Sequence, residues 1–177
     1  MWFIGLLLTL GLGLGSAATL EKLSLDEMIR KSTGIVCGKV LASSTIKRGP
    51  VVYTQYRLRV TDRWKGNAVS EIDVHVPGGK HGSVQQLFSG SPKLDEGKEY
   101  VVFLWTSRGG LTQVIGLSQG LFDVKRDPKG EPVLTRFPSA ENTMLDSSGR
   151  VVEEPPVSMR LGDMVDRIHR TLTGASR

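Results

Sequence analysis

Apolar and polar residues alternate along much of the chain between residues 35 and 137. Such alternation predicts strands, because successive side chains of an extended chain point to opposite faces of a sheet. The segments that follow this pattern are separated by Gly, Pro, Asn and Asp, which are typical of turns. They are Ile35 to Ile46, Val51 to Trp64, Ile72 to Val76, Tyr100 to Trp105 and Val114 to Val124, with Val133 to Phe137 as a further candidate. The pattern predicts a mostly β domain.

Helical patterns lie on both sides of these segments. Ser24 can cap a helix that has Glu27 three residues on, as in a capping box, and Leu23 and Met28 in the places of a hydrophobic staple. Gly34 ends this short helix. Near the other end of the chain, apolar residues recur at every third or fourth position, which predicts an amphipathic helix: Leu161, Met164, Val165, Ile168 and Leu172. We expect this helix to pack on the domain, with docking on a partner as the alternative.

The first 18 residues, MWFIGLLLTLGLGLGSAA, are apolar and carry no charged side chain. The run is shorter than the roughly 20 apolar residues of a membrane-spanning helix. Ser16 and Ala18 have the small side chains of a signal-peptidase site. We therefore predict a signal peptide over residues 1–18, with cleavage after Ala18. The protein is expected in the periplasm or the extracellular space, with no transmembrane anchor after cleavage.

The predicted elements divide the rest of the chain into three parts. Residues 19–137 hold the N-terminal helix and the strands of one β domain. Residues 138–158 have no apolar period and are predicted to form a loop or linker. Residues 159–177 contain the C-terminal helix. A chain of this size can bury the core of a single domain.

Charge and cysteine content narrow the class of protein only slightly. The chain has 23 Lys and Arg against 18 Asp and Glu, a net charge of +5. That excess permits binding to an anionic partner, but it is also what keeps an ordinary domain soluble. The single cysteine, Cys37, lies in the apolar stretch GIVCGKV and has no partner for an internal disulfide. We expect a buried, unreactive thiol.

One motif resembles a catalytic site. Residues Gly116 to Gly120 fit the G-x-S-x-G pattern of a serine-hydrolase nucleophile elbow, and His169 follows in the order that a triad requires. An elbow joins a strand to a helix, whereas here the apolar segment continues beyond Gly120 and Pro128 opposes a helix. We therefore predict that Ser118 is a strand or bulge residue and that the protein is not an enzyme.

Metal and phosphate motifs are the other chemical candidates. His75 and His81 lie close together in the sequence, and Asp73 and Asp95 could add oxygen ligands, but their spacing matches no zinc motif. The stretch GGKHG lacks both the earlier glycine and the hydroxyl residue of a phosphate-binding loop. No metal or cofactor is predicted.

The segment Val51 to Trp64 has two chemically different faces. If Tyr56, Leu58 and their apolar neighbours point into the core, the opposite face presents an aromatic ring and several cations: Tyr53, Arg57, Arg59 and Arg63. Strand faces of this kind bind anionic ligands in some β-barrels. These four residues are the candidate binding face, and a solvated basic surface without a ligand is the alternative.

Several stretches resemble a family of exported bacterial proteins of uncharacterised function. They are STGIVCGKV, a strand that ends in RWKG, IDVHVPGG, SGSPKLDEGKEYVVFL and VIGLSQGLFDV, in this order between Leu25 and Val124. That family is similar to netrin-like and metalloproteinase-inhibitor-like modules. The resemblance implies a five-stranded OB-like barrel with flanking helices, and a binding role without catalysis.

Two departures from those modules limit what the resemblance implies. The inhibitors chelate a catalytic zinc with an N-terminal cysteine, whereas the predicted mature chain begins at Thr19. The animal modules carry disulfides, which a single cysteine cannot form internally. Protease inhibition is therefore not expected.

Two function classes follow. The first is a non-catalytic protein-interaction domain of the cell envelope with an unknown protein partner. The second is an OB-type binder of an anionic glycan or single-stranded nucleic acid through the candidate binding face, with nucleic acid less expected because of export.

Overall fold

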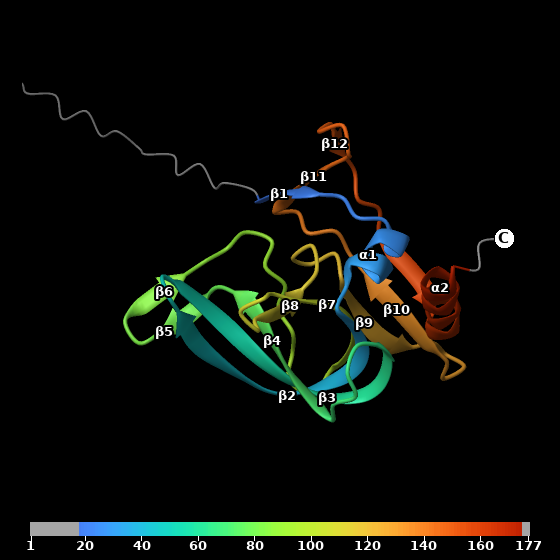
Figure 1. Cartoon of the computed structure of the whole chain (residues 1–177), viewed down its shortest axis with the longest axis horizontal. Coiled ribbons are helices and arrows are strands. Elements are labelled where there is room, and N and C mark those ends of the chain that lie inside the picture. Colours follow the sequence, from blue (N-terminus) through green and yellow to red (C-terminus); the bar gives the residue numbers. More distant parts are fainter. Residues whose placement is uncertain (1–17, 175–177) are drawn as a thin grey trace, which may run out of the picture.

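The computed structural model describes residues 18–174 and shows a mostly β chain with two helices, α1 (Leu25–Lys31) and α2 (Leu161–Thr173) (Figure 1). The predicted signal peptide lies outside the described residues except for Ala18. The capping box is confirmed, because the Ser24 hydroxyl accepts from the Glu27 backbone and the Glu27 carboxylate accepts from the Ser24 N–H at 2.9 Å. Within residues 18–174, neither helix combines the length and the apolar character that a bilayer crossing needs.

The main sheet has eight strands in the order β13-β10-β9-β7-β2-β3-β4, and β8 pairs with β7 beside this path. Its strands are β2 (Gly34–Arg48), β3 (Val51–Lys65), β4 (Glu71–Pro77), β7 (Glu99–Thr106), β8 (Thr112–Val114), β9 (Leu121–Arg126), β10 (Pro132–Arg136) and β13 (Val157–Arg160). Two small sheets complete the chain: β1 (Ala18–Glu21) with β11 (Asn142–Leu145) and β12 (Val151–Val152), and β5 (Gly79–His81) with β6 (Val84–Gln86).

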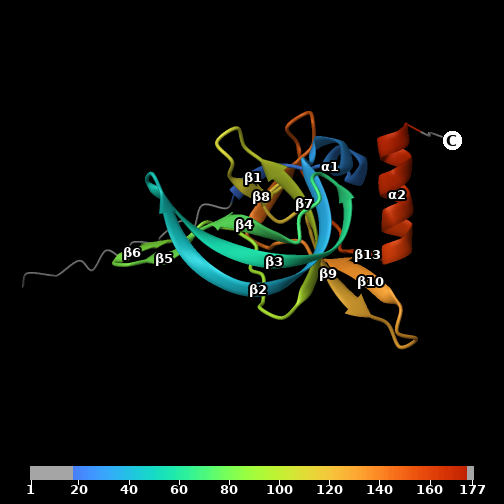
Figure 2. The same cartoon turned by 60° about the horizontal axis from the view of Figure 1, so that its bottom comes forward.

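The sheet curls because its two longest strands bend. Strands β2 and β3 have 15 residues each and form a curved hairpin (Figure 2). Their register shifts at three places, and each such irregularity increases the local twist. The curl brings β4 towards β8, where His75 Nδ1 lies 3.2 Å from the Thr112 carbonyl oxygen. These two strands do not pair, so the eight-stranded main sheet stays open, and the predicted five-stranded barrel is not confirmed.

Two apolar cores lie on opposite faces of β2 and β7. Val36, Val102 and Leu104 belong to the core inside the curl, together with buried residues of β3 and β4. Cys37 and Phe103 belong to the second core. Both faces of these central strands are buried, so their sequences are nearly continuous apolar runs.

The two helices cover the second core. Its helical residues are Met28, Ile29, Met164 and Ile168. Outside the core, Asp26 accepts two hydrogen bonds from Arg167, at 2.7 and 2.8 Å, which connect α1 to α2. Helix α2 thus packs against the second core through Met164 and Ile168.

The predicted strand from Val114 to Val124 is wrong. Strand β8 ends at Val114, residues 115–120 form turns, and β9 begins at Leu121. Gly116 and Leu117 have φ angles of 61° and 63°, which an extended strand cannot contain. Strands β8 and β9 both pair antiparallel with β7, so the chain leaves this edge of β7 in a turn and then resumes along it in the same direction.

The segment 138–158, predicted as a loop or linker, contains β11, β12 and the start of β13. Strand β11 pairs with the distant β1 and with β12, and β13 pairs with β10 at the edge of the main sheet. Such pairing depends on tertiary context and leaves little local pattern. The candidate strand near residues 133–137 is confirmed as β10.

Candidate binding site

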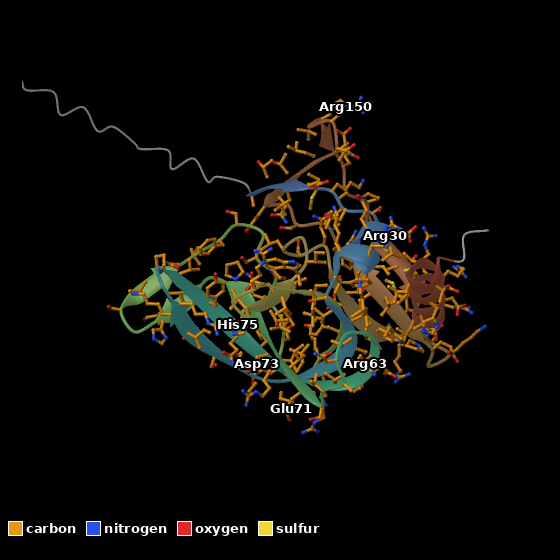
Figure 3. All side chains as sticks on the ribbon, viewed as in Figure 1. Arg30, Arg63, Glu71, Asp73, His75 and Arg150 are labelled. Atoms are coloured by element: carbon orange, nitrogen blue, oxygen red, sulfur yellow. The ribbon has the colours of Figure 1, made fainter. Side chains whose placement is uncertain are left out.

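The four residues of the candidate binding face lie on β3. Val52 and Leu58 are fully buried while Arg57 and Arg59 are exposed, so the predicted alternation is confirmed from Val52 to Arg59. It does not extend to Trp64, which was predicted on the face of Leu58 but packs against the second core. Arg63 lies beyond a register shift of the hairpin and donates to the Gly66 carbonyl oxygen at 2.8 Å. Figure 3 places Arg63 apart from Glu71, Asp73 and His75, which follow one another along β4.

The neighbours of this face on β4 reduce its positive charge. Arg57 donates to both oxygens of Asp73, at 2.9 and 3.1 Å, and these hydrogen bonds lower the pKa of that carboxyl group. Arg59 stands opposite Glu71 in the strand register. The arginines therefore form part of a surface of mixed charge.

Tyr53 contributes to a different contact. Its ring packs edge-on against His75, with 6.4 Å between the ring centroids. The predicted face is thus spread along β3, and the structure does not bring its four residues together around one hollow.

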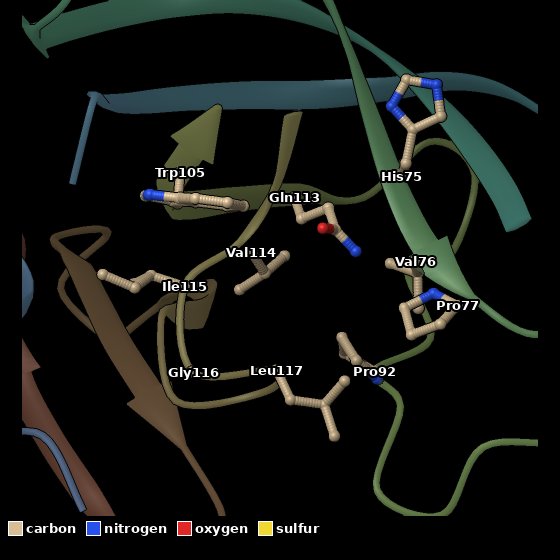
Figure 4. A pocket seen from close by; sticks show the side chains of 10 residues that line it. All are labelled: His75, Val76, Pro77, Pro92, Trp105, Gln113, Val114, Ile115, Gly116 and Leu117. Carbon is tan, nitrogen blue, oxygen red and sulfur yellow. The ribbon is translucent and has the colours of Figure 1, made fainter. Parts of the chain in front are cut away.

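A hollow of about 230 Å³ lies between β4 and the segment that begins with β8 (Figure 4). Sequence analysis missed it, because its lining comes from four separate parts of the chain. The lining residues are His75, Val76, Pro77, Pro92, Trp105, Gln113, Val114, Ile115, Gly116 and Leu117. The walls are mainly apolar, with Gln113 and His75 as polar groups.

The backbone on either side explains why the hollow exists. His75 is buried, and its contact with the Thr112 carbonyl holds β4 to β8 at one end. At the other end, the chain turns away at Gly116 and Leu117. Leu117 is the one non-glycine residue with a positive φ among residues 18–174, and a leucine in that conformation is strained. Backbone strain of this kind often accompanies functional sites.

Trp105 is the aromatic side chain of the hollow, and it is 44% exposed. It lies near the end of β7, directly after the buried residues 100–104, and is the first exposed residue of the strand. Tryptophan is enriched in the centres of protein interfaces because it removes a large apolar area from water.

Hydrogen bonds of Gln119 hold the turn that follows Ile115 in place. The buried Gln119 side chain accepts from the Leu23 N–H at 2.8 Å and donates to the Glu21 carbonyl at 2.9 Å. The guanidinium of Arg136 donates to the Gln119 carbonyl. These bonds connect the turn to the segment between β1 and α1 and to β10. They therefore hold the wall of the hollow that residues 115–117 form.

Ser118 lies in this turn and accepts a hydrogen bond from Asn142 at 3.2 Å. This turn was not predicted from the sequence, which indicated a continuous strand with Ser118 in it; the turn leads into strand β9, whereas a nucleophile elbow leads into a helix. The G-x-S-x-G glycines have a structural reason, because a Cβ at Gly120 would lie 3.0 Å from the Phe103 backbone oxygen.

The remaining candidate groups are dispersed. Cys37 is buried, and burial raises the pKa of its thiol to about 12. His81 contacts the Thr45 carbonyl, and Asp95 pairs with Lys98 at 2.7 Å. Over residues 18–174, no three His, Cys, Asp or Glu side chains gather as a metal site would require.

Comparisons of the chain with protein-family models, with curated proteins and with solved structures found no match.

Proposed function

We propose that the protein is a non-catalytic binding domain with an OB-type core, exported to the cell envelope, which holds a protein partner at the hollow between β4 and β8. The hollow receives one apolar or aromatic side chain of the partner, and Trp105 forms the main contact. The exposure of Trp105 beside this hollow is the observation on which the proposal depends.

The strand order supports an OB-type core. Strands β2, β3 and β4 follow one another as hairpin-connected neighbours, and β7 returns through a long connection to lie beside β2. This 4-1-2-3 arrangement is a Greek key. With β9 next to β7, the five strands resemble the partly open Greek-key barrel of OB modules, whose open side here lies between β4 and β8.

The size of the hollow favours a side chain over a free small molecule. Sites for drug-sized ligands have volumes of about 300–1,000 Å³. The hollow, at about 230 Å³, lies below that range. A partner that inserts one anchoring residue could gain further contact area from the exposed surface around it.

The alternative, an anionic ligand on the candidate binding face, has weaker support. Arg57 already has a carboxylate partner, and Glu71 stands opposite Arg59. An anionic glycan or nucleic acid would have to compete with these carboxylates for the arginines.

Selection from a random peptide library tests the proposal. The affinity of peptides selected on the wild-type protein is then measured for the Trp105→Ala and Val69→Ala variants. Val69 is the matched control, because its side chain is also 44% exposed but lies outside the lining of the hollow. Trp105→Ala is expected to weaken binding by about tenfold or more, because it removes a central aromatic anchor, while Val69→Ala leaves it unchanged.

Binding that depends on Arg57 and Arg59 and not on Trp105 would contradict the hollow as the site. A salt titration of heparin binding distinguishes the alternative function. A ligand whose anionic groups are neutralised by several cations gives a steep salt dependence.

A further inference from the structure

Two hairpins meet at the end of the molecule opposite α2 (Figures 1 and 2). We call this region the hairpin end and define it as residues 45–52, the tip of the β2–β3 hairpin, and residues 79–88, the β5–β6 hairpin with the two residues that follow it. The hairpin end is separate from the hollow, whose lining includes none of these residues.

Side-chain bonds join the two hairpins into one unit. Gln86 accepts from the Val52 N–H at 2.7 Å and donates to the Pro50 carbonyl at 2.8 Å. Thr45 donates to the Lys80 carbonyl at 2.8 Å. Because these bonds hold Gln86 against the tip of the β2–β3 hairpin, the next residue, Leu87, starts beside that tip.

The hairpin end is positively charged and contains no carboxylate. It carries Lys47, Arg48 and Lys80, all exposed, while residues 28–61 and 74–94 include no Asp or Glu. Among the described residues 18–174, no carboxylate forms a hydrogen bond or an ion pair with residues 45–52 or 79–88, and the bonds closest in sequence are those of Glu96 to Ser43 and of Glu141 to Gly90. The cations at the tip therefore differ from the arginines of β3, which face acidic residues on β4.

Large apolar side chains are exposed at the same place. Leu87 is 86% exposed and Phe88 is 43% exposed, and they follow directly on Gln86. They follow the β5–β6 hairpin directly, and neither lines the hollow between β4 and β8. Exposed apolar residues next to cations are typical of surfaces that lie in the interface of a membrane.

We propose that the hairpin end docks the protein on the surface of an anionic lipid bilayer. Leu87 and Phe88 enter the boundary between headgroups and acyl chains, and Lys47, Arg48 and Lys80 lie against the anionic headgroups. Charge complementarity selects this occupant, since each Lys or Arg near an anionic membrane surface increases binding by about fivefold. The docked protein keeps the hollow available for its partner.

Vesicle sedimentation tests the proposal with the chain from Thr19 to Arg177, which contains every residue of both cores. Its cooperative unfolding is verified first by circular dichroism. Two vesicle types are compared: phosphatidylcholine alone, and phosphatidylcholine mixed with phosphatidylglycerol. Binding is expected to the anionic vesicles, and it should weaken as salt is added, because salt screens the cations.

Two double variants address the two parts of the surface, each with a matched control. Lys47→Glu with Arg48→Glu removes adjacent cations and is compared with Lys125→Glu and Arg126→Glu, an adjacent exposed pair on β9. Leu87→Ser with Phe88→Ser is compared with Leu172→Ser and Phe137→Ser, which are exposed outside the hairpin end. Each variant of the hairpin end should lower the partition coefficient by about tenfold or more, and each control by less than about twofold.

Equal binding to neutral and anionic vesicles, or equal losses in variants and controls, would overturn the proposal. So would failure to bind anionic vesicles at low salt. Binding to poly-glutamate that is stronger than binding to anionic vesicles would assign the hairpin end to an acidic protein segment instead.

Discussion

The two ends of the molecule are built differently. At the helix end, α1, α2 and strands β9, β10 and β13 surround a core that also buries one face of β2 and β7. At the hairpin end, β5 and β6 form a two-stranded sheet, and the exposed Leu87 and Phe88 follow it directly. An isolated two-stranded hairpin is at best marginally stable in water. The comparison indicates that the helix end supplies most of the stability, while the hairpin end and the hollow supply surfaces for binding.

The buried ion pair of the helix end is the strongest test of this comparison. Arg136 pairs with Glu154 at 3.0 Å, and its guanidinium lies over the Phe122 ring at 5.0 Å. Arg136→Ala would leave the buried Glu154 without its cation, so the free energy of unfolding is expected to fall by about 3–5 kcal/mol. Urea denaturation measures the change.

Arg150→Ala is the control for this variant, because Arg150 also pairs with a carboxylate but is 81% exposed. It should leave the urea midpoint nearly unchanged. Equal effects of the two substitutions would show that the helix end does not depend on its buried pair.

A pair of glycines with positive φ tests the junction between the two ends. A Cβ at Gly90 would lie 1.6 Å from the Asn142 side chain, whereas a Cβ at Gly82 has open space around it. Both have φ angles near 60–70°, so each Ala variant has the same backbone strain of about 1–2 kcal/mol. Gly90→Ala adds the steric conflict, and we expect a total loss of about 3 kcal/mol. Thermal unfolding of both variants should show the larger loss for Gly90→Ala, and the reverse order would contradict the packing of residues 87–92 against β11.

Two glutamines make matched backbone contacts at the two ends. Gln119 satisfies the Leu23 N–H and the Glu21 carbonyl and is 1% exposed. Gln86 satisfies the Val52 N–H and the Pro50 carbonyl in a more exposed setting. Replacement by Ala should cost about 2 kcal/mol at Gln119, where backbone groups lose partners away from water, and about 1 kcal/mol or less at Gln86.

Hydrogen exchange shows where each loss acts. Gln86→Ala should raise exchange at β5 and β6 only, while Gln119→Ala should lower protection throughout the second core. A global effect of Gln86→Ala would mean that the hairpin end contributes more to stability than its exposure indicates.

The sequence predicted the elements whose signals are local. The capping box at Ser24 and Glu27 specifies α1, and alternation along β3 identifies its buried and exposed faces. Both signals arise between residues a few positions apart, so that they can be read without knowing the rest of the fold.

The sequence could not predict the features that join distant segments. Strand β1 pairs with β11 across more than a hundred residues, and neither has a strong pattern of its own. The hollow collects residues from four parts of the chain, and in the sequence Trp105 marks only the end of a predicted strand, because its exposure beside the hollow is a feature of the folded structure. The charge of the arginines on β3 was visible in the sequence, but Asp73 as the partner of Arg57 depended on the pairing with β4.

The thiol of Cys37 gives a pH-dependent test of the core on the helix side. Burial raises its pKa from 9.0 to about 12. Above pH 9 the unfolded chain releases this proton while the folded protein keeps it, so stability is lost as the pH rises from 9 towards 12. The loss is about 1 kcal/mol per pH unit in this window. Urea unfolding at several pH values should show this slope in the wild type and a smaller slope in Cys37→Ala. Identical slopes would place the thiol in contact with water.

The smallest effect is expected on the exposed face of β3, where Arg57 and Asp73 form an ion pair with side-chain exposures of 52% and 34%. Solvent screens such a pair, and ordering two side chains opposes it. The hydrogen bonds from Arg57 lower the pKa of Asp73, so any stabilisation is present at neutral pH and is lost as the pH falls through the lowered pKa. We expect Arg57→Gln with Arg59→Gln, which removes the cations without placing new carboxylates opposite Asp73 and Glu71, to leave the melting temperature nearly unchanged and to have little effect on binding at the hollow. A large loss of heparin binding without a change in melting temperature would instead support the anionic-ligand function of this face. A large fall in melting temperature would contradict the exposure of Arg57 and Arg59, because it would show that this face of β3 is packed against the rest of the protein.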